Sequence, residues 1–252
     1  MAKQTAKRVA KRANRPNPRE DRNYPRLVDD QFDSTTVKQV KKPLLIPRNL
    51  AQEDYVDVLD NESKHIVFAM GPAGCGKTYL AAILAVRSLK EGTVDKIIIT
   101  RPAVSVDEKH GFLPGTLIEK MAPWVTPIMD VFKEFYTVQQ IERMLEQEVI
   151  EIAPLAYMRG RTFKNSIVLF DEAQNATPDQ MKMVLTRIGD NTRMIITGDL
   201  AQHDRGFDKN GLKDFVERLE RRGSEAMAVC RFAAQDVERH PVIEEILNIY
   251  DA

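Results

Sequence analysis

The stretch Gly71-Pro72-Ala73-Gly74-Cys75-Gly76-Lys77-Thr78 decides the fold of this chain. It follows an apolar run at residues 66–70 and opens a helical pattern at residues 79–89, which predicts a strand, a glycine loop and a helix in that order. The spacing G-x-x-x-x-G-K-T in this context is the pattern of a P-loop. Glycines let successive backbone N–H groups turn toward an anion, and the helix N-terminus adds partial positive charge. We therefore predict a nucleoside triphosphate site rather than a glycine-rich turn that binds nothing.

The loop residues divide the work of holding a triphosphate. Lys77 is expected to reach the β- and γ-phosphates, and the Thr78 hydroxyl is expected to ligate Mg²⁺. The predicted cofactor-binding residues of this stretch are Gly71, Pro72, Ala73, Gly74, Cys75, Gly76, Lys77, Thr78 and Tyr79.

Two consecutive acids end another apolar run. Residues 167–170 read Ile-Val-Leu-Phe and lead directly into Asp171 and Glu172. Downstream of a P-loop, Asp171 is placed to hold Mg²⁺, directly or through water, and Glu172 to orient the attacking water. We therefore predict that Lys77, Asp171 and Glu172 are catalytic and that Thr78 and Asp171 lie at the metal.

Apolar runs alternate with amphipathic stretches along most of the chain. The runs lie at residues 66–70, 97–100, 149–152, 167–170, 194–197 and 227–232, and the helical stretches at 79–89, 178–188 and 210–219. This alternation predicts one α/β domain at residues 44–252, with a mostly parallel sheet covered by helices on both faces. Ligands of such sheets bind at the carboxyl ends of the strands. The aromatic residues Trp124, Phe132, Phe135 and Tyr136 recur at helical spacing, and we expect them mainly in the core rather than as platforms for bases.

Two further strand ends carry polar residues. After residues 194–197, Gln202 is the candidate sensor of the γ-phosphate, and Asp199 is expected to support Thr78, the metal or the loop, or only to form an Asx turn. After residues 97–100, Arg101 either contacts a phosphate or pairs with an acid. The long segment at 104–115 is a candidate contact for nucleic acid.

Hydrolysis needs a guanidinium to balance charge on the γ-phosphoryl oxygens, which is worth about 10³–10⁵ in rate. The candidate arginines are Arg159, Arg161, Arg231 and Arg239. The sequence does not choose among them.

Composition limits the function classes. The 37 Lys and Arg residues balance 37 Asp and Glu residues, but residues 1–43 are strongly basic and form a predicted flexible arm, either a tether for nucleic acid or a solubilising linker. The 2 cysteines make neither a disulfide framework nor a zinc site. No membrane span and no secretory signal are recognised, so we expect a soluble protein of a reducing compartment, the cytoplasm.

Several blocks of the chain resemble the PhoH family, over about residues 44–250. The blocks are Gly71–Thr78, Thr100–Val104, Gly111–Gly115, Ala153–Thr162, Asp171–Asn175, Met181–Met183, Leu185–Gly189, Thr197–Asp199 with Gln202, Arg231-Phe232, Asp236-Val237 and Arg239–Pro241. Cys75 replaces the threonine or serine that is more usual at its position.

The resemblance implies a RecA-like ATPase core related to superfamily 1 helicases, with ATP and Mg²⁺ as cofactors. It also implies a homo-oligomeric ring, whose size the sequence leaves open with a hexamer as the candidate, and activity on single-stranded RNA or DNA. By the same likeness Gln52 reads adenine, and Gln174 and Gln202 lie near the γ-phosphate. A fused nuclease domain is not recognised.

Superfamily 1 helicases complete the ATP site with a second RecA-like domain, for which we see no room in this chain. A neighbouring copy is therefore expected to supply the arginine. The leading hypothesis is a Mg²⁺-dependent ATPase that acts as an RNA helicase or translocase. The alternatives are an ATPase without unwinding activity and a nucleotide-gated assembly or scaffold module.

Overall fold

The computed structural model describes residues 42–102, 117–202 and 210–238, together with 242, 243, 246 and 249; the side chains of residues 117–122 are not described. Nearly all of the predicted arm at residues 1–43, and the segment at 104–115, lie outside the described residues. The division into an arm and a domain therefore stays a prediction. The chain from Val40 to Ala252 forms one compact unit.

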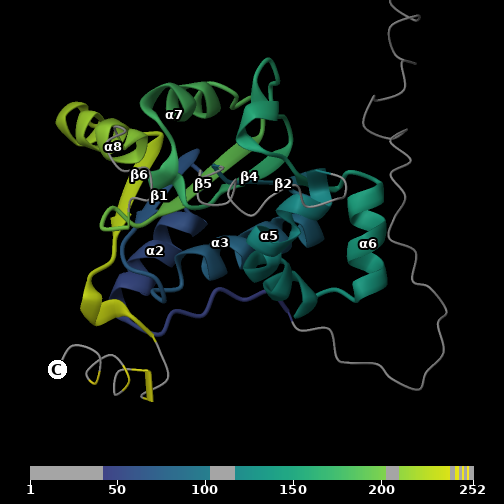
Figure 1. Cartoon of the computed structure of the whole chain (residues 1–252), viewed down its shortest axis with the longest axis horizontal. Helices are drawn as coiled ribbons and strands as arrows, with labels where there is room; N and C mark the ends of the chain where they lie inside the picture. Colours follow the sequence, from purple (N-terminus) through teal and green to yellow (C-terminus); the bar gives the residue numbers. More distant parts are fainter. Residues whose placement is uncertain are drawn as a thin grey trace, which may run out of the picture. The chain divides into compact units, whose positions relative to one another are not determined.

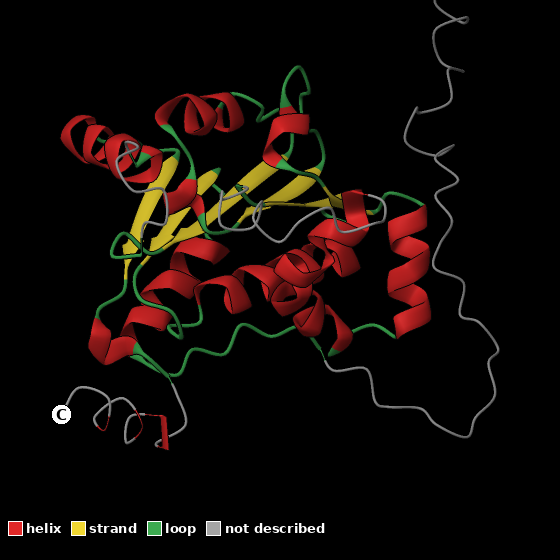
Figure 2. Ribbon diagram, viewed as in Figure 1, coloured by secondary structure: helices red, strands yellow, loops and turns green. Residues whose placement is uncertain are grey.

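The core of this unit is a six-stranded sheet in which every strand pairing is parallel (Figures 1 and 2). The strands lie in the order β3-β2-β4-β5-β1-β6. Their bounds are β1 Ile66–Met70, β2 Lys96–Thr100, β3 Ile150–Ile152, β4 Ser166–Phe170, β5 Thr192–Gly198 and β6 Met227–Arg231. The P-loop strand β1 is thus separated from β4, which precedes the acidic pair, by one strand, β5.

Helices cover both faces of the sheet (Figure 2). One face carries α2 (Leu50–Asp60), α3 (Lys77–Glu91), α5 (Leu117–Lys133) and α6 (Val138–Glu146), and the other carries α7 (Pro178–Leu185) and α8 (Gly211–Arg222). Short 3₁₀ helices lie at Leu155–Met158 (η1), Ala173–Asn175 (η2) and Ala234–Asp236 (η3). Two separate clusters of buried apolar side chains fill the space between the sheet and each helical layer. None of the helices in the described part of the chain has the length and apolarity needed to cross a bilayer.

The predicted fold class, an α/β domain with a parallel sheet covered by helices on both faces, is confirmed. All six predicted strands are present, and β1, β4 and β5 are buried along almost their whole length because a parallel sheet is covered on both sides. Phe132, Phe135 and Tyr136 are buried as predicted, whereas Trp124 is half-buried.

The sequence interpretation did not recognise α5 and α6 as helices. Pro123 and Pro127 lie inside α5, and proline inside a pattern normally indicates that a helix ends there. The start of α6 carried a usable signal, because the Thr137 side chain and the Gln140 side chain cap each other's backbone N–H groups.

Candidate functional site

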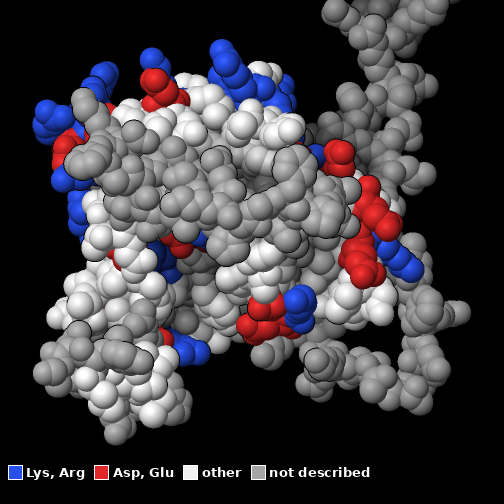
Figure 3. All heavy atoms as spheres, in the orientation of Figure 1, with Lys and Arg blue, Asp and Glu red and all other residues white. Residues whose placement is uncertain are grey.

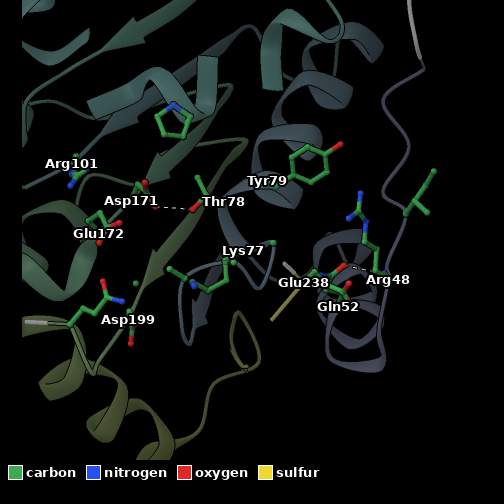
Figure 4. A pocket seen from close by; sticks show the side chains of 17 residues that line it. Arg48, Gln52, Lys77, Thr78, Tyr79, Arg101, Asp171, Glu172, Asp199 and Glu238 are labelled. Carbon is green, nitrogen blue, oxygen red and sulfur yellow. Dashed lines mark hydrogen bonds between the residues drawn. The ribbon is translucent and has the colours of Figure 1, made fainter. Parts of the chain in front are cut away.

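A cavity of about 460 Å³ opens at the carboxyl ends of β1, β4 and β5 (Figure 4). It brings together most of the residues selected from the sequence, although they come from four separate segments. The predicted residues that line it are Gln52, Ala73, Gly74, Gly76, Lys77, Thr78, Tyr79, Asp171, Glu172 and Gln202, and Arg101 and Asp199 line it as well.

At three positions, Gly71, Gly74 and Gly76, the P-loop has a positive φ that only glycine adopts without strain. Gly71 has φ 150°, and a Cβ there would lie 2.5 Å from the carbonyl oxygen of Phe232. Gly76 has φ 78° and forms the N-cap of α3, where a Cβ would lie 3.0 Å from Nε2 of Gln52. The loop is therefore packed between β6 and α2, and the N-terminus of α3 faces the cavity, where its exposed N–H groups favour an anion.

Lys77 lies over the loop that precedes it. Its Nζ donates hydrogen bonds to the carbonyl oxygens of Gly71 and Pro72, both at 2.7 Å, and the residue is only 8% exposed. Burial lowers the pKa of the ammonium, while the charges nearby, including Asp199 and Asp171, act to raise it. Gly71 and Pro72 thus contribute backbone carbonyls to this contact rather than surface to the cavity.

Asp171 receives hydrogen bonds from two hydroxyl groups. Thr78 Oγ1, at the start of α3, donates to Asp171 Oδ1 at 2.9 Å, and Thr197 Oγ1, from β5, donates to the same oxygen. One carboxylate and a threonine hydroxyl form a small, oxygen-only donor set. Magnesium is bound in this way, through one or two protein oxygens completed by phosphates and water. Among the described residues there is no cluster of three or more His, Cys, Asp or Glu that could hold a metal.

Glu172 is held in place by a buried amide. Its backbone has φ 52°, a left-handed conformation that is uncommon outside glycine. Its carboxylate accepts a hydrogen bond from Nε2 of Gln174, and Oε1 of Gln174 accepts one from the backbone N–H of Asp199 at 3.0 Å. Through these two hydrogen bonds Gln174, which is fully buried, links Glu172 after β4 to the turn after β5.

Asp199 supports the local loop. Its Oδ1 accepts a hydrogen bond from the backbone N–H of Ala201 at 2.9 Å, which is an Asx-type turn, and its carbonyl accepts from the N–H of Gln202 at 3.2 Å. Of the alternatives left open for Asp199, the structure thus shows support of the loop through an Asx turn, while the hydrogen bond with Thr78 is made by Asp171. Gln202 reaches the cavity wall from this turn.

The opposite end of the cavity is formed by residues that lie far apart in the sequence. Gln52 is 4% exposed; its Nε2 donates to the carbonyl of Cys75 at 3.2 Å, and its Oε1 accepts from the backbone N–H of Arg48 at 3.0 Å. Figure 4 shows Arg48, Gln52 and Glu238 together at this end, with Tyr79 beside them and Asp171 and Glu172 at the other.

Sequence reasoning missed Arg48, Glu238 and Ile46 as parts of this wall. Arg48 carried a weak signal, because it stands just before Asn49, the residue that caps α2. Glu238 lies 164 positions after Gly74 and meets it only through the fold, where its N–H donates to the Gly74 carbonyl at 3.1 Å.

The candidate arginines do not meet at the cavity. Arg161 forms a two-pronged ion pair with Glu151, one of whose bonds measures 2.8 Å, and Arg231 pairs with Glu220 at 2.7 Å. Arg159 is exposed on the segment after η1, and none of these three lines the cavity. Arg239 lies outside the described residues. Arg48 and Arg101 are the arginines among the described lining residues.

Comparisons with known proteins match most of the chain to a single family. A family model described as PhoH-like protein matches residues 44–251. A PhoH-like protein of Bacillus subtilis (strain 168) is 42% identical over 232 residues, which cover 91% of this chain and 71% of that protein. Protein PhoH of Escherichia coli (strain K12) is 41% identical over 258 residues, covering 99% and 71%. A PhoH-like protein of Synechocystis is 44% identical over 205 residues, covering 81% of this chain and 61% of that protein.

Two solved structures show a more distant likeness. The Pyrococcus furiosus Hef helicase domain is 13% identical, with a TM-score of 0.44 and coverage of 79% of this chain and 41% of that one. The Sulfolobus solfataricus SWI2/SNF2 ATPase core in complex with dsDNA is 16% identical, with a TM-score of 0.37 and coverage of 64% and 34%.

Proposed function

The chain belongs to the PhoH family of P-loop proteins, and from this premise we propose that it hydrolyses ATP to move along single-stranded nucleic acid, as an RNA helicase or translocase. The observation that carries the ATPase assignment is the contact between Thr78 and Asp171, with Glu172 next in the chain. A P-loop hydroxyl bonded to the acid that ends another strand of the same sheet is the arrangement that holds a metal beside the phosphates.

The residues of the cavity divide the reaction among them. The phosphates lie against the P-loop N–H groups and the N-terminus of α3, and the Lys77 ammonium turns from the carbonyls of Gly71 and Pro72 to the phosphate oxygens. Thr78 and Asp171 are the residues that would hold Mg²⁺, which when bound neutralises charge on the phosphates. Glu172 orients the attacking water and accepts its proton, while Gln174 fixes the direction of the Glu172 carboxylate.

Gln52 selects the base. One hydrogen of its amide is used on Cys75 and one lone pair on Arg48, so the amide cannot flip and keeps one free donor and one free acceptor. Adenine offers one acceptor and one donor, N7 and N6–H₂, whereas guanine offers two acceptors at the same edge. The fixed amide therefore matches ATP and leaves its acceptor unpaired with GTP.

A neighbouring copy supplies a guanidinium in addition to Arg48 and Arg101 of the lining. Arg159 is exposed, and Arg161, Arg231 and Arg239 remain candidates for insertion into the cavity of another subunit. Packing of one patch against a different patch closes into a ring when the rotation permits, so we propose a homo-oligomeric ring, with a hexamer as one possible size. Hydrolysis would then loosen a contact between subunits.

Two basic regions are the candidate contacts with nucleic acid. One is the arm at residues 1–43, and the other is the edge formed by α7 and α8, over which Lys and Arg side chains gather (Figure 3). Binding through such charges releases counterions from phosphate, so stimulation of hydrolysis by single strands should fall as salt rises.

The test is Glu172→Gln, with Glu217→Gln on the exposed face of α8 as the matched control. Loss of a general base costs about 10²–10⁴ in rate, so E172Q should bind ATP within a few-fold of wild type and release phosphate at least 100-fold more slowly, whereas E217Q should behave as wild type. Equal, slow phosphate release by all three proteins would favour the second candidate, a nucleotide-gated scaffold. The intact Asp171–Glu172 pair argues against that candidate, because a protein that only binds ATP needs no carboxylate to orient water.

A further inference from the structure

The segment that leads into α2 presents an unusual face. From Lys42 to Leu50 exposed and half-buried residues alternate strictly, as in an extended chain that lies on a surface. Leu45 packs against the core, whereas Leu44, Ile46 and Leu50 are 59%, 67% and 79% exposed. We call the outward residues Lys42, Leu44, Ile46, Arg48 and Leu50 the entry face. It is apolar with basic side chains interspersed.

A second apolar surface lies at the C-terminal end. Val242, Ile243, Ile246 and Ile249 are helical, and they are 47%, 37%, 46% and 70% exposed. Their successive spacings of one, three and three residues are typical of one side of a helix. We call these four residues the tail stripe. Four aliphatic side chains on one side of a helix form an apolar patch, and folded proteins normally cover such a patch with another surface.

The two surfaces are complementary in charge as well as in polarity. The tail stripe is interrupted and followed by acids, Glu244, Glu245 and Asp251, and the entry face is preceded and interrupted by bases, Lys41, Lys42 and Arg48. Opposite charges around an apolar centre favour docking of one surface on the other and disfavour self-pairing of either.

Both surfaces are connected to the nucleotide cavity. Ile46 and Arg48 of the entry face line its base end. The tail stripe begins four residues after Glu238, whose N–H donates to the Gly74 carbonyl and whose Oε1 accepts from Asn49 Nδ2 at 3.1 Å. Asn49 also caps α2, the helix that carries Gln52. Glu238 and Asn49 therefore join the chain before the tail stripe to the P-loop and to the helix that carries Gln52.

We propose that the tail stripe of one copy docks on the entry face of the next copy and covers the base end of that copy's nucleotide cavity. In a single chain the aliphatic side chains of the two surfaces are 37% to 79% exposed. Because the two patches differ, the contact is head to tail, and only a closed ring leaves none of them uncovered. This docking extends the ring of the proposed function, but it can be tested without ATP hydrolysis.

The first experiment locates the contact. Leu44→Cys and Ile246→Cys are made in separate chains, mixed, and treated with a short bismaleimide. The native thiols give little background, because Cys75 is fully buried and burial raises the pKa of Cys230 to about 11. A cross-linked product of dimer mass should form in the mixture and not with either variant alone. Absence of that product would overturn the proposal. A second chain that carries both Leu44→Cys and Ile246→Cys is treated in the same way, and a cross-link at monomer mass, formed within one chain, would also overturn it.

The second experiment measures the strength of the contact by sedimentation. Ile246→Asp combined with Ile249→Asp should weaken assembly about 10- to 100-fold or more, because two aliphatic side chains lose their apolar contact. Val138→Asp on α6, an equally exposed aliphatic residue at 54%, is the control and should assemble as wild type. Binding of a fluorescent ATP analogue checks that each variant is folded. Assembly of the tail variant equal to wild type would refute the docking, while a wild type that assembles but does not hydrolyse ATP would refute only the proposed function.

Discussion

Replacing Gln174 by glutamate should slow ATP hydrolysis while leaving ATP binding nearly unchanged. Gln174 is fully buried and joins the Glu172 carboxylate to the backbone N–H of Asp199. Glutamate has the same shape and keeps an acceptor for Asp199. It removes the donor to Glu172, however, and places a second carboxylate beside it. The substitution therefore acts directly on the direction and protonation of Glu172.

The magnitude follows from the bond that is lost. A hydrogen bond to a charged group contributes about 1.5–3 kcal/mol, and at about 1.36 kcal/mol per tenfold change in rate the loss corresponds to about 10- to 150-fold in kcat. Two adjacent carboxylates also cannot both ionise easily, so the pair's apparent pKa rises. The rate of Q174E should consequently increase with pH across a range in which the wild-type rate is flat.

The assay is phosphate release against ATP concentration at several pH values. Gln139→Glu, which adds the same charge on the exposed surface of α6, is the control and should match wild type. A merely structural role for Gln174 would lower the melting temperature without altering the pH profile. Wild-type kcat in Q174E, or a raised KM with unchanged kcat, would refute the assignment of Gln174 as the residue that positions Glu172.

Three further substitutions test the loop, the metal site and the edge of the sheet. Gly71→Ala should lower the melting temperature and abolish ATP binding, because its Cβ would lie 2.5 Å from the Phe232 carbonyl; Gly160→Ala, with φ 79° and no atom within 4 Å, should show only a small loss of stability. Asp171→Asn should lose most of the gain in ATP affinity that Mg²⁺ gives, measured by calorimetry with and without EDTA. Glu151→Gln tests the pH dependence of stability. The hydrogen bond from Arg161 lowers the pKa of Glu151 in the folded protein. The ionised carboxylate therefore stabilises the fold above its unfolded pKa, and this stabilisation is lost as pH falls through the folded pKa. The difference in unfolding free energy should be about 1 kcal/mol near pH 7 and shrink below about pH 4, and a difference that grows in acid would contradict it.

The sheet was predictable from the sequence because its strands are buried on both faces. A run such as Ile97-Ile98-Ile99 has no other stable place in a soluble domain, and each run ended within one or two residues of the observed strand. The helix α5 was not predictable by the same rules. Pro123 and Pro127 indicate a break, yet Val125, Ile128 and Phe132 are buried against the core, and this packing outweighs the backbone bonds that proline removes.

Some of the site could likewise be predicted from the sequence and some could not. Residues within one motif, such as Lys77 and Thr78, could be assigned from spacing alone, since the loop's backbone fixes where they point. Contacts between motifs could not, because they depend on strand order. Thr197 reaches Asp171 only because β5 lies beside β4, and Glu238 reaches Gly74 only because β6 lies beside β1. A single sequence contains these residues without indicating that they meet.

The charge balance of the described lining supports the proposal that the cavity needs further cations to bind a triphosphate. Among the described residues, its lining contributes three cations, Arg48, Lys77 and Arg101, and four carboxylates, Asp171, Glu172, Asp199 and Glu238, so the formal charge of this part of the lining is 3 − 4 = −1. A triphosphate adds several negative charges in a partly enclosed space, where water and salt screen repulsion less than in solution. Metal-free ATP should therefore bind weakly, and Mg²⁺ at Thr78 and Asp171 together with a guanidinium from another copy would supply the missing positive charge. Asp171→Asn tests this repulsion, because the variant lacks one of the lining carboxylates. The variant should bind metal-free ATP more tightly than wild type does and Mg²⁺-ATP less tightly. Simple damage to the site would weaken the binding of both forms. Weaker binding of both forms would show that repulsion by the lining carboxylates does not govern the site.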